Sequence, residues 1–375
     1  MKAYVFTDKG LERYAGRFVW LSVNTENAKN AEFLTKYKIP ALPTLLVLEP
    51  RNDSILLRYV GGATIGQLTK MLDDVRKSSA SNSDSIVRAA DRLSAEGKHK
   101  DAAKVYQQAL EQAPKHWRKY GRTAESLLFA LSTTQQYEHC TQRALEFLPK
   151  LKGTVSGASA AATGLACAIG LDEKHADRAK LIAAFQTPSH EALDDRKLEL
   201  SADDRSGLYI VLIDARDALE DEAGSNRLEQ EWVAHLEKAA SEAKTPDQRA
   251  VYDSHRLSAY MRVGTPEKAI PMLEETQRDF PDDYNPPYRL SLAYKAMKEW
   301  DKGLEMVDRA MAKLYGPRKI LAYRLRSDIL AAKGDNEAAR ETIAEAVQYA
   351  KSLPLGQRND RTIASLEKKL SEMPQ

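Results

Sequence analysis

The two cysteines, Cys140 and Cys167, carry the most reactive side chains in this sequence. A disulfide-rich scaffold or a cysteine-based zinc module needs more cysteines at closer spacing, so neither is expected. His139 precedes Cys140, but neighbours on a helix lie about 100° apart around its axis, so the two do not form a catalytic dyad. We expect both cysteines to be small, buried side chains, distant from each other and without thiol–disulfide exchange activity.

Other reactive residues show no pattern typical of a catalytic or metal site. The seven histidines are scattered, and no HExxH, P-loop, GxGxxG or GxSxG motif occurs. No metal or cofactor is therefore expected. The 56 Lys and Arg residues are interleaved with 54 Asp and Glu residues, which predicts no nucleic-acid-binding surface. The uncharged stretch 153–171 is rich in Gly, Ala, Ser and Thr, and this composition predicts a closely packed internal helix rather than a membrane span.

The first eighty residues predict a small α/β unit. Residues 17–23, 44–48 and 55–60 are rich in β-branched and aromatic side chains and predict three buried strands. Apolar residues at helical spacing predict helices over 31–37 and 64–76. Residues 2–14 read as the end of a preceding helix, with Tyr4, Leu11 and Tyr14 available for the core.

This order of elements resembles the C-terminal half of the thioredoxin fold. Leu42-Pro43-Thr44 resembles the position where that family carries a cis-proline before a strand, and Gly61-Gly62 resembles its glycine after the last strand. The resemblance implies that Pro43 is cis. The family's redox chemistry needs a CxxC motif, and no cysteine precedes Cys140, so this βαββα unit is expected to be redox-inactive. One explanation is that the sequence begins at an internal methionine of a longer protein. The other is a reduced fold in which strands 17–23 and 44–48 pair directly.

Beyond a Ser-rich run at 78–85, a helical repeat register recurs five times. Each copy has an anchor residue in a predicted tight turn, a large apolar residue four positions earlier and a small residue five positions later. The small residue allows two helices to approach closely. The anchors are Gly97, Gln135, Gly264, Lys298 and Gly334.

The register closely resembles the tetratricopeptide repeat, which implies an α-helical solenoid. The fold class expected is thus a partial thioredoxin-like α/β unit followed by a TPR-like helical array. Residues 151–249 are helical but drift off the register, with a turn predicted at Gly224-Ser225-Asn226. The expected boundaries are 1–78 for the α/β unit, 79–85 for a linker, 86–150 and 250–352 for regular hairpins, 151–249 for degenerate ones and 353–375 for a capping helix.

In TPR-like arrays the first helix of each hairpin lines a groove. The resemblance implies that the last three hairpins present a basic surface there, formed by His255, Arg262, Tyr288, Arg289, Lys295 and Arg324. Such a surface suits an acidic peptide or a free C-terminal carboxylate. The Asn pattern of the family's known carboxylate clamp is absent, and the alternative is an ordinary solvated helix face. We expect Arg289 and Arg324 to point into one concavity.

The function expected from these features is a protein-binding scaffold that is not an enzyme, with a protein or peptide partner. The first alternative is a thiol–disulfide oxidoreductase whose CxxC lies upstream of Met1, with the repeats recruiting substrates. The second, an enzyme of another class within 151–249, lacks any clustering of nucleophile, base and acid. As written the chain would stay in the cytoplasm, whereas a longer form with an export signal would reach the periplasm or leave the cell.

Overall fold

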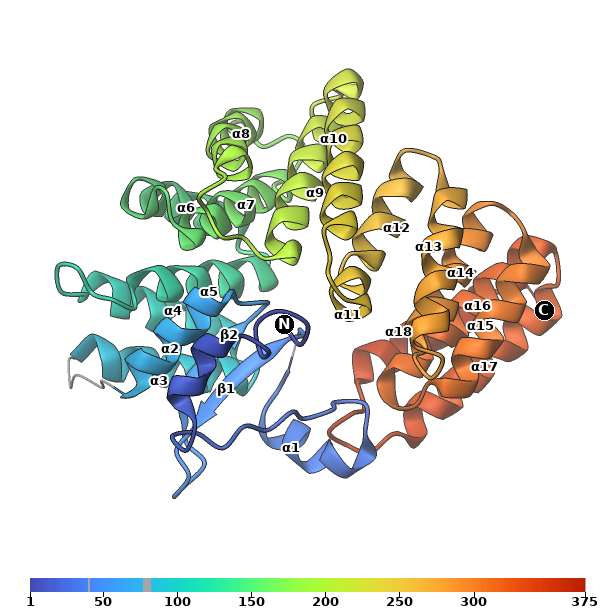
Figure 1. Ribbon diagram of the computed structural model, residues 1–375, viewed down its shortest axis with the longest axis horizontal. Helices are drawn as coiled ribbons and strands as arrows, with labels where there is room; N and C mark the ends of the chain where they lie inside the picture. The colour runs from blue at the N-terminus through green and yellow to red at the C-terminus, as the bar shows by residue number, and fades with distance from the viewer. Residues whose placement is uncertain (40, 77–81, 375) are drawn as a thin grey trace. The chain divides into compact units, whose positions relative to one another are not determined.

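The structure is a computed structural model that describes residues 1–39, 41–76 and 82–374 (Figure 1). The chain divides into two compact units, and neither is a single stretch of sequence. Unit 1 comprises Met1–Phe18 and Lys38–Trp232, and unit 2 comprises Val19–Tyr37 and the chain from Val233 onward. Each unit is described by itself below.

Unit 1 begins with a small α/β layer. Strands β1 (Thr44–Leu48) and β2 (Ile55–Val60) pair antiparallel and form a two-stranded sheet, and helix α2 (Ile65–Arg76) packs beside them. A short 3-10 helix, Lys9–Tyr14, brings the buried Tyr14 into this core, where its hydroxyl donates to Asp73 Oδ1 at 2.7 Å. The Leu42–Pro43 bond is cis, which confirms the prediction for Pro43. The sheet alone does not distinguish a thioredoxin-like unit from another α/β unit.

The predicted strand at residues 17–23 is wrong. These residues form no strand, and the side chains of Val19 and Leu21 are 88% and 82% exposed. A strand needs a neighbour for its backbone hydrogen bonds, and β-propensity alone does not supply one. Direct pairing of this segment with β1 is therefore also wrong, because β1 pairs with β2.

The rest of unit 1 is a stack of helical hairpins. From α3 to α9 each helix packs against the next one. Because α5 also packs on α7, and α7 on α9, these first helices of successive hairpins form one layer (Figure 1). The helices are α3 (Asn82–Ala95), α4 (His99–Glu111), α5 (Tyr120–Thr133), α6 (Tyr137–Leu151), α7 (Val155–Ile169), α8 (Arg178–Asp194), α9 (Ala202–Ala218) and α10 (Glu222–Ser241), which continues into unit 2.

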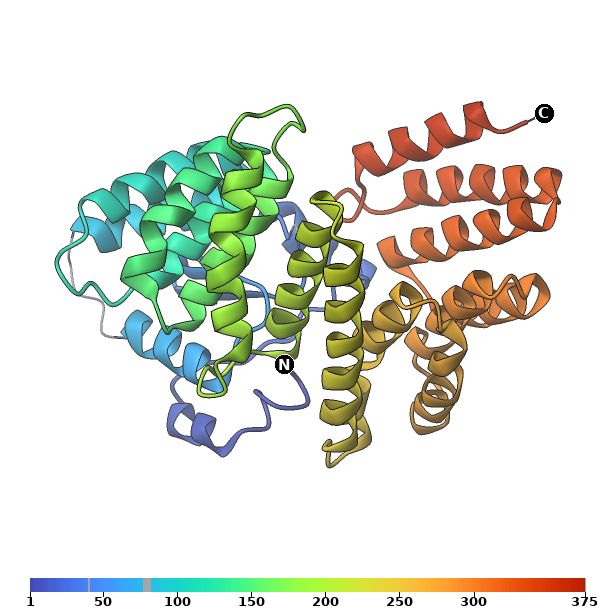
Figure 2. The same ribbon diagram turned by 90° about the horizontal axis from the view of Figure 1, so that it is seen from above.

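Unit 2 is a second stack, in which α14 packs on both α12 and α16, and α18 packs on α17 (Figure 2). Helix α18 lies within the stretch 353–375 that is predicted to be a capping helix. The segment 19–37 joins this stack with the short helix α1 (Ala31–Lys36) and a 3-10 turn, Ala28–Asn30. The other helices are α11 (Pro246–Ala250), α12 (Asp253–Arg262), α13 (Ala269–Asp279), α14 (Asn285–Ala296), α15 (Trp300–Lys313), α16 (Lys319–Lys333), α17 (Asn336–Ser352) and α18 (Asp360–Glu372), with 3-10 turns at Pro266–Lys268 and Gly316–Arg318.

The repeat register is confirmed at every anchor. All five anchors lie between the two helices of a hairpin and adopt a left-handed backbone, with φ of 77°, 57°, 74°, 60° and 97° for Gly97, Gln135, Gly264, Lys298 and Gly334. The small residues five positions later are all buried, namely Ala102, Cys140, Ala269, Gly303 and Ala339. The turn and the close helix contact therefore recur as a unit, as the spacing predicts.

The degenerate region also forms hairpins, but its predicted turn is wrong. Gly224, Ser225 and Asn226 lie inside α10, and the chain turns at Leu219–Asp221 instead. The reason is a local cap, because Asp221 Oδ1 accepts a hydrogen bond from Gly224 N at 2.9 Å and starts the helix upstream of the glycine. The stretch predicted as a packed internal helix is α7, and most of its small residues are buried. None of the helices in the described ranges is long and apolar enough to cross a membrane.

The two cysteines are buried as expected, but the expectation that they are distant is wrong. Cys140 in α6 and Cys167 in α7 form a disulfide, with their Cα atoms 6.2 Å apart. Sequence separation misled the prediction, because consecutive helices of the stack lie side by side. Closing a loop across 27 residues contributes about 3–4 kcal/mol through the lost entropy of the unfolded chain.

Candidate functional site

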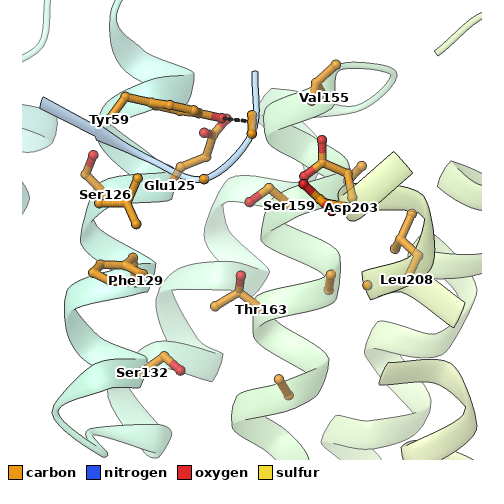
Figure 3. Close-up of a pocket in the computed structure, with 18 of the residues that line it drawn as sticks. Tyr59, Glu125, Ser126, Phe129, Ser132, Val155, Ser159, Thr163, Asp203 and Leu208 are labelled. Carbon is orange, nitrogen blue, oxygen red and sulfur yellow. Dashed lines mark hydrogen bonds between the residues drawn. The ribbon is translucent and has the colours of Figure 1, made fainter. Parts of the chain in front are cut away.

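A half-enclosed cavity of about 400 Å³ lies in unit 1, on the layer formed by α5, α7 and α9. The strand β2 and the residues that follow it also line the cavity, together with single residues of α3 and α4. Figure 3 shows how side chains from the three helices face this space. Tyr59 and Glu125 lie together on one side, and Asp203 faces them from α9.

Helical periodicity explains which side chains reach the cavity. On α5, Ser126, Phe129 and Ser132 follow at intervals of three residues and share one face. On α7, Ser159 and Thr163 are one turn apart in a helix otherwise made almost entirely of small apolar residues. Hydroxyl groups both donate and accept hydrogen bonds. The cavity thus has a polar stripe on each of two neighbouring helices.

Carboxylates gather at the start of α9. Asp203 and Asp204 lie in the first turn of this helix, where negative charge is favourable to the helix dipole. Ser201 and Asp204 form a capping box, in which Ser201 Oγ accepts from Asp204 N at 3.1 Å. Burial raises the pKa of Asp204 above its ordinary value, and its hydrogen bonds with Ser201 oppose that rise.

Glu125 has the most perturbed carboxyl group of the cavity. The pKa of Glu125 is raised to about 7, mainly by burial, and the nearby charge of Asp204 acts in the same direction. Hydrogen bonds from Ser156 and Tyr59 and the charge of Arg122 act in the opposite direction. A carboxyl group with this pKa changes its charge near neutral pH, so the charge inside the cavity depends on pH.

Arg58 lines the cavity from β2 together with Ser94 of α3 and Tyr106 of α4. Its guanidinium Nη1 donates to Ser94 Oγ at 2.9 Å. Burial lowers the pKa of Arg58 from its ordinary value. His99 lies close to this group, since its Nδ1 is 3.4 Å from Ser94 Oγ, and burial followed by the charge of Arg58 lowers the pKa of His99. The cavity therefore holds a buried cation as well as acidic groups.

The six residues of the predicted basic surface lie elsewhere, on the first helices of the three hairpins of unit 2. They are His255 and Arg262 in α12, Tyr288, Arg289 and Lys295 in α14, and Arg324 in α16.

Several of these side chains have partners within unit 2. Lys295 Nζ is 3.4 Å from Asp328 Oδ2, and Arg324 Nη2 donates to Ser365 Oγ of α18 at 3.2 Å. Burial lowers the pKa of Arg289, while the charge of Asp253 opposes this shift. The shared concavity for Arg289 and Arg324, and a ligand there, stay predictions.

Sequence reasoning missed every polar residue of the unit 1 cavity. Arg58 belongs to a short strand, and the other polar groups come from helices spread over a long stretch of chain. One signal was present: Ser159 and Thr163 are polar residues one turn apart in an Ala- and Gly-rich helix, and such a pair marks a face that does not pack into the core. Among the described residues, no three His, Cys, Asp or Glu side chains come together as a metal site.

No protein-family model matches this sequence, and neither does any curated protein sequence. A tetratricopeptide repeat protein from Parabacteroides merdae is similar in structure over 77% of this chain and 99% of its own, with 9% identity and a TM-score of 0.45. The TPR2AB domain of yeast Sti1 in a pHSP90 complex is similar over 77% of this chain and 98% of its own, with 14% identity and a TM-score of 0.28. A thermophilic TPR protein of Thermus thermophilus is similar over 77% of this chain and 97% of its own, with 14% identity and a TM-score of 0.26. These values do not assign a family, so the TPR-like register rests on the turns and helix contacts described above.

Proposed function

We propose that this chain is a protein-binding scaffold and that the cavity on α5, α7 and α9 holds a peptide segment of its partner. The observation that carries the proposal is the cavity itself, which combines the aromatic face of Phe129 with hydroxyls on two neighbouring helices. An extended peptide can use both kinds of group, because its backbone forms hydrogen bonds while its apolar side chains pack against the ring. Stacked hairpins supply the helical part of such a surface, and β2 with the residues after it supplies the rest.

Thiol–disulfide exchange is the weaker alternative. The sequence contains only Cys140 and Cys167, and these are bonded to each other with both side chains fully buried. Exchange requires a thiolate to reach a disulfide sulfur, which burial prevents. The peptide-binding proposal uses surface that is accessible.

The proposal is tested by selecting peptides from a displayed random nonapeptide library on the full chain, and then measuring their affinity for variants. Ser159→Trp places a large ring in the cavity and is expected to lower the affinity for the selected peptides by at least about tenfold, or 1.4 kcal/mol. Ser85→Trp is the matched control, because Ser85 is an exposed residue of α3 outside the cavity. Equal affinity for both variants would show that the peptides bind elsewhere, and failure to select any peptide would count against the proposal.

A further inference from the structure

Residues 17–23 have the composition of a buried strand but form no strand within one chain. Their most exposed side chains are Val19 at 88% and Leu21 at 82%, whereas Trp20 between them is 47% exposed. In an extended segment side chains alternate in direction, so Val19 and Leu21 lie on the same side. The segment therefore presents an apolar stripe to solvent, which proteins usually cover with another element.

Strand β1 has an edge with no strand beside it in the described part of the chain, because the sheet there consists of β1 and β2. Gly61 N donates to Pro43 O at 2.9 Å at the start of this ladder. Hydrogen-bonded pairs alternate along an antiparallel ladder, so the N–H and C=O groups of Leu46 point away from β2. Leu45 and Val47 face the core beside α2 and are only half-buried. This edge can accept both backbone pairing and further apolar cover.

The apolar pattern of the segment matches that of the edge. In an antiparallel register that places Val19 opposite Val47, Leu21 falls opposite Leu45. Residues directly opposite each other point to the same face of a sheet, so both exposed side chains would continue the apolar face of β1. Pairing in this register buries the stripe and pairs the open edge at the same time.

Charge selects the same direction. The antiparallel register places Arg17 opposite Glu49, which follows β1 directly, so that a positive and a negative side chain meet at the end of the added strand. A parallel register with the same apolar match would place Arg17 opposite Pro43 instead. The antiparallel direction is therefore favoured by both side-chain pattern and charge.

We propose that two copies of the chain associate by placing residues 17–23 of each copy on the β1 edge of the other. A second copy is the partner that carries both complementary elements, and a two-fold axis makes the contact twice. The inference goes beyond the proposed function and does not depend on it, because the contact uses the edge of β1 rather than the cavity on α5, α7 and α9.

The test is sedimentation velocity of the full chain from about 1 to 200 µM. The expected result is a reversible equilibrium between one chain and two chains. Its dissociation constant should lie at about 1–100 µM, because each added strand contributes only a small interface. A single chain at every concentration overturns the inference.

Leu21→Lys places a charge in the middle of the added strand, and charged side chains are a common way to block strand pairing. This variant is expected to raise the dissociation constant by at least about tenfold. Leu355→Lys is the matched control, because Leu355 is 67% exposed and lies outside both paired elements. Both changes affect exposed side chains, so the melting temperature should stay that of the wild type. Equal dissociation constants for the two variants would count against the proposed contact.

A charge exchange tests the register and shows that the contact joins two copies. Arg17→Glu and Glu49→Arg each place like charges opposite each other at both contacts of the dimer, so each variant alone should associate about tenfold more weakly than the wild type. An equimolar mixture of the two variants pairs opposite charges at both contacts and should recover the association of the wild type. A mixture that associates no better than either variant alone overturns the inference, since a contact within one chain or at another surface gains nothing from mixing.

Discussion

Arg58 and Glu125 line the same cavity, and burial disfavours the charged form of each. The two differ in how the protein responds. The guanidinium stays charged at all pH values of interest, so the cost of burying it persists across that range. The carboxyl of Glu125, whose pKa burial raises to about 7, avoids its cost by holding a proton below neutral pH.

The raised pKa of Glu125 predicts a pH-dependent stability that Glu125→Gln removes. Between the pKa of about 4.5 expected in the unfolded chain and about 7 in the folded one, the folded state holds the extra proton. The free energy of unfolding therefore falls as pH rises through this window and levels off above it. Because Glu125 retains some exposure, we expect about 1–2 kcal/mol rather than the full value of the shift.

Urea unfolding of wild type and Glu125→Gln between pH 4.5 and 8 checks this. The variant should gain stability relative to the wild type as pH rises, since an amide cannot ionise. Glu111→Gln, at an exposed position of α4, serves as the control and should track the wild type. A constant difference between wild type and Glu125→Gln across the range would contradict the assignment.

At the scale of elements, the hairpins and the two strands at 44–48 and 55–60 were predictable, whereas the strand predicted at 17–23 was wrong. The register depends on local physics, namely a turn that needs a left-handed residue and a contact that needs a small one, so a single sequence carries it. The strand predicted at 17–23 depends on a neighbouring strand that the local sequence does not specify. The cavity depends on residues from several elements, and only their joint position makes Arg58 or Glu125 unusual. Their chemistry is a property of packing, which periodicity does not reveal.

The left-handed backbone of the hairpin turns predicts opposite stability effects for substitutions at two equivalent turn positions. Lys298 and Gly264 occupy equivalent turn positions, with φ of 60° and 74°, and the side chain of Lys298 is exposed. A left-handed conformation costs a non-glycine residue about 1–2 kcal/mol, partly offset by the extra freedom of glycine in the unfolded chain. Lys298→Gly should therefore raise the free energy of unfolding by about 0.5–1 kcal/mol.

The reverse change supplies the control. A Cβ added at Gly264 meets nothing within 4 Å, so Gly264→Ala tests the backbone alone and should lower the free energy of unfolding by about 1 kcal/mol. Both values come from urea titration of the full chain. The same sign for the two variants would show that the turn conformation does not decide their stability.

At the scale of the whole molecule, the chain enters unit 2 twice. Residues 19–37 pack among the residues that lead into and out of the last hairpin, α16 and α17. Glu26 Oε2 accepts from the backbone N–H of Arg318 at 2.7 Å, and Gln357 Nε2 donates to Thr25 O at 2.8 Å. A side chain at Gly316 would collide with Glu26, because an added Cβ would lie 2.3 Å from its carbonyl oxygen. This close approach ties an early segment of sequence to a late one.

Glu26→Ala is therefore expected to weaken unit 2 while leaving unit 1 intact. The carboxylate of Glu26 lies at the start of the turn that leads into α16, where it satisfies an N–H group and complements the helix dipole. Its loss should cost about 1–2 kcal/mol. Hydrogen–deuterium exchange should show faster exchange in both 19–37 and α16 and no change in α4 or α5.

Glu32→Ala is the control, because Glu32 is an exposed residue of α1 in the same segment. Its exchange pattern should match that of the wild type. Faster exchange in unit 1 after Glu26→Ala would contradict the division of the chain, and an effect confined to residues 19–37 would show that α16 does not depend on the contact.

The early segment of unit 2 has a consequence for how the protein is made. Glu26 leaves the ribosome long before Arg318, which follows 292 residues later. At about 5–20 residues per second, the delay between the two is roughly 15–60 s. Unit 1 has its whole sequence available before unit 2 does, whereas residues 19–37 must wait for nearly the last hairpin to be translated. During that interval Thr25 and Glu26 are without the hydrogen-bond partners that Gln357 and Arg318 later supply, so this segment cannot complete its folded contacts until synthesis is nearly finished.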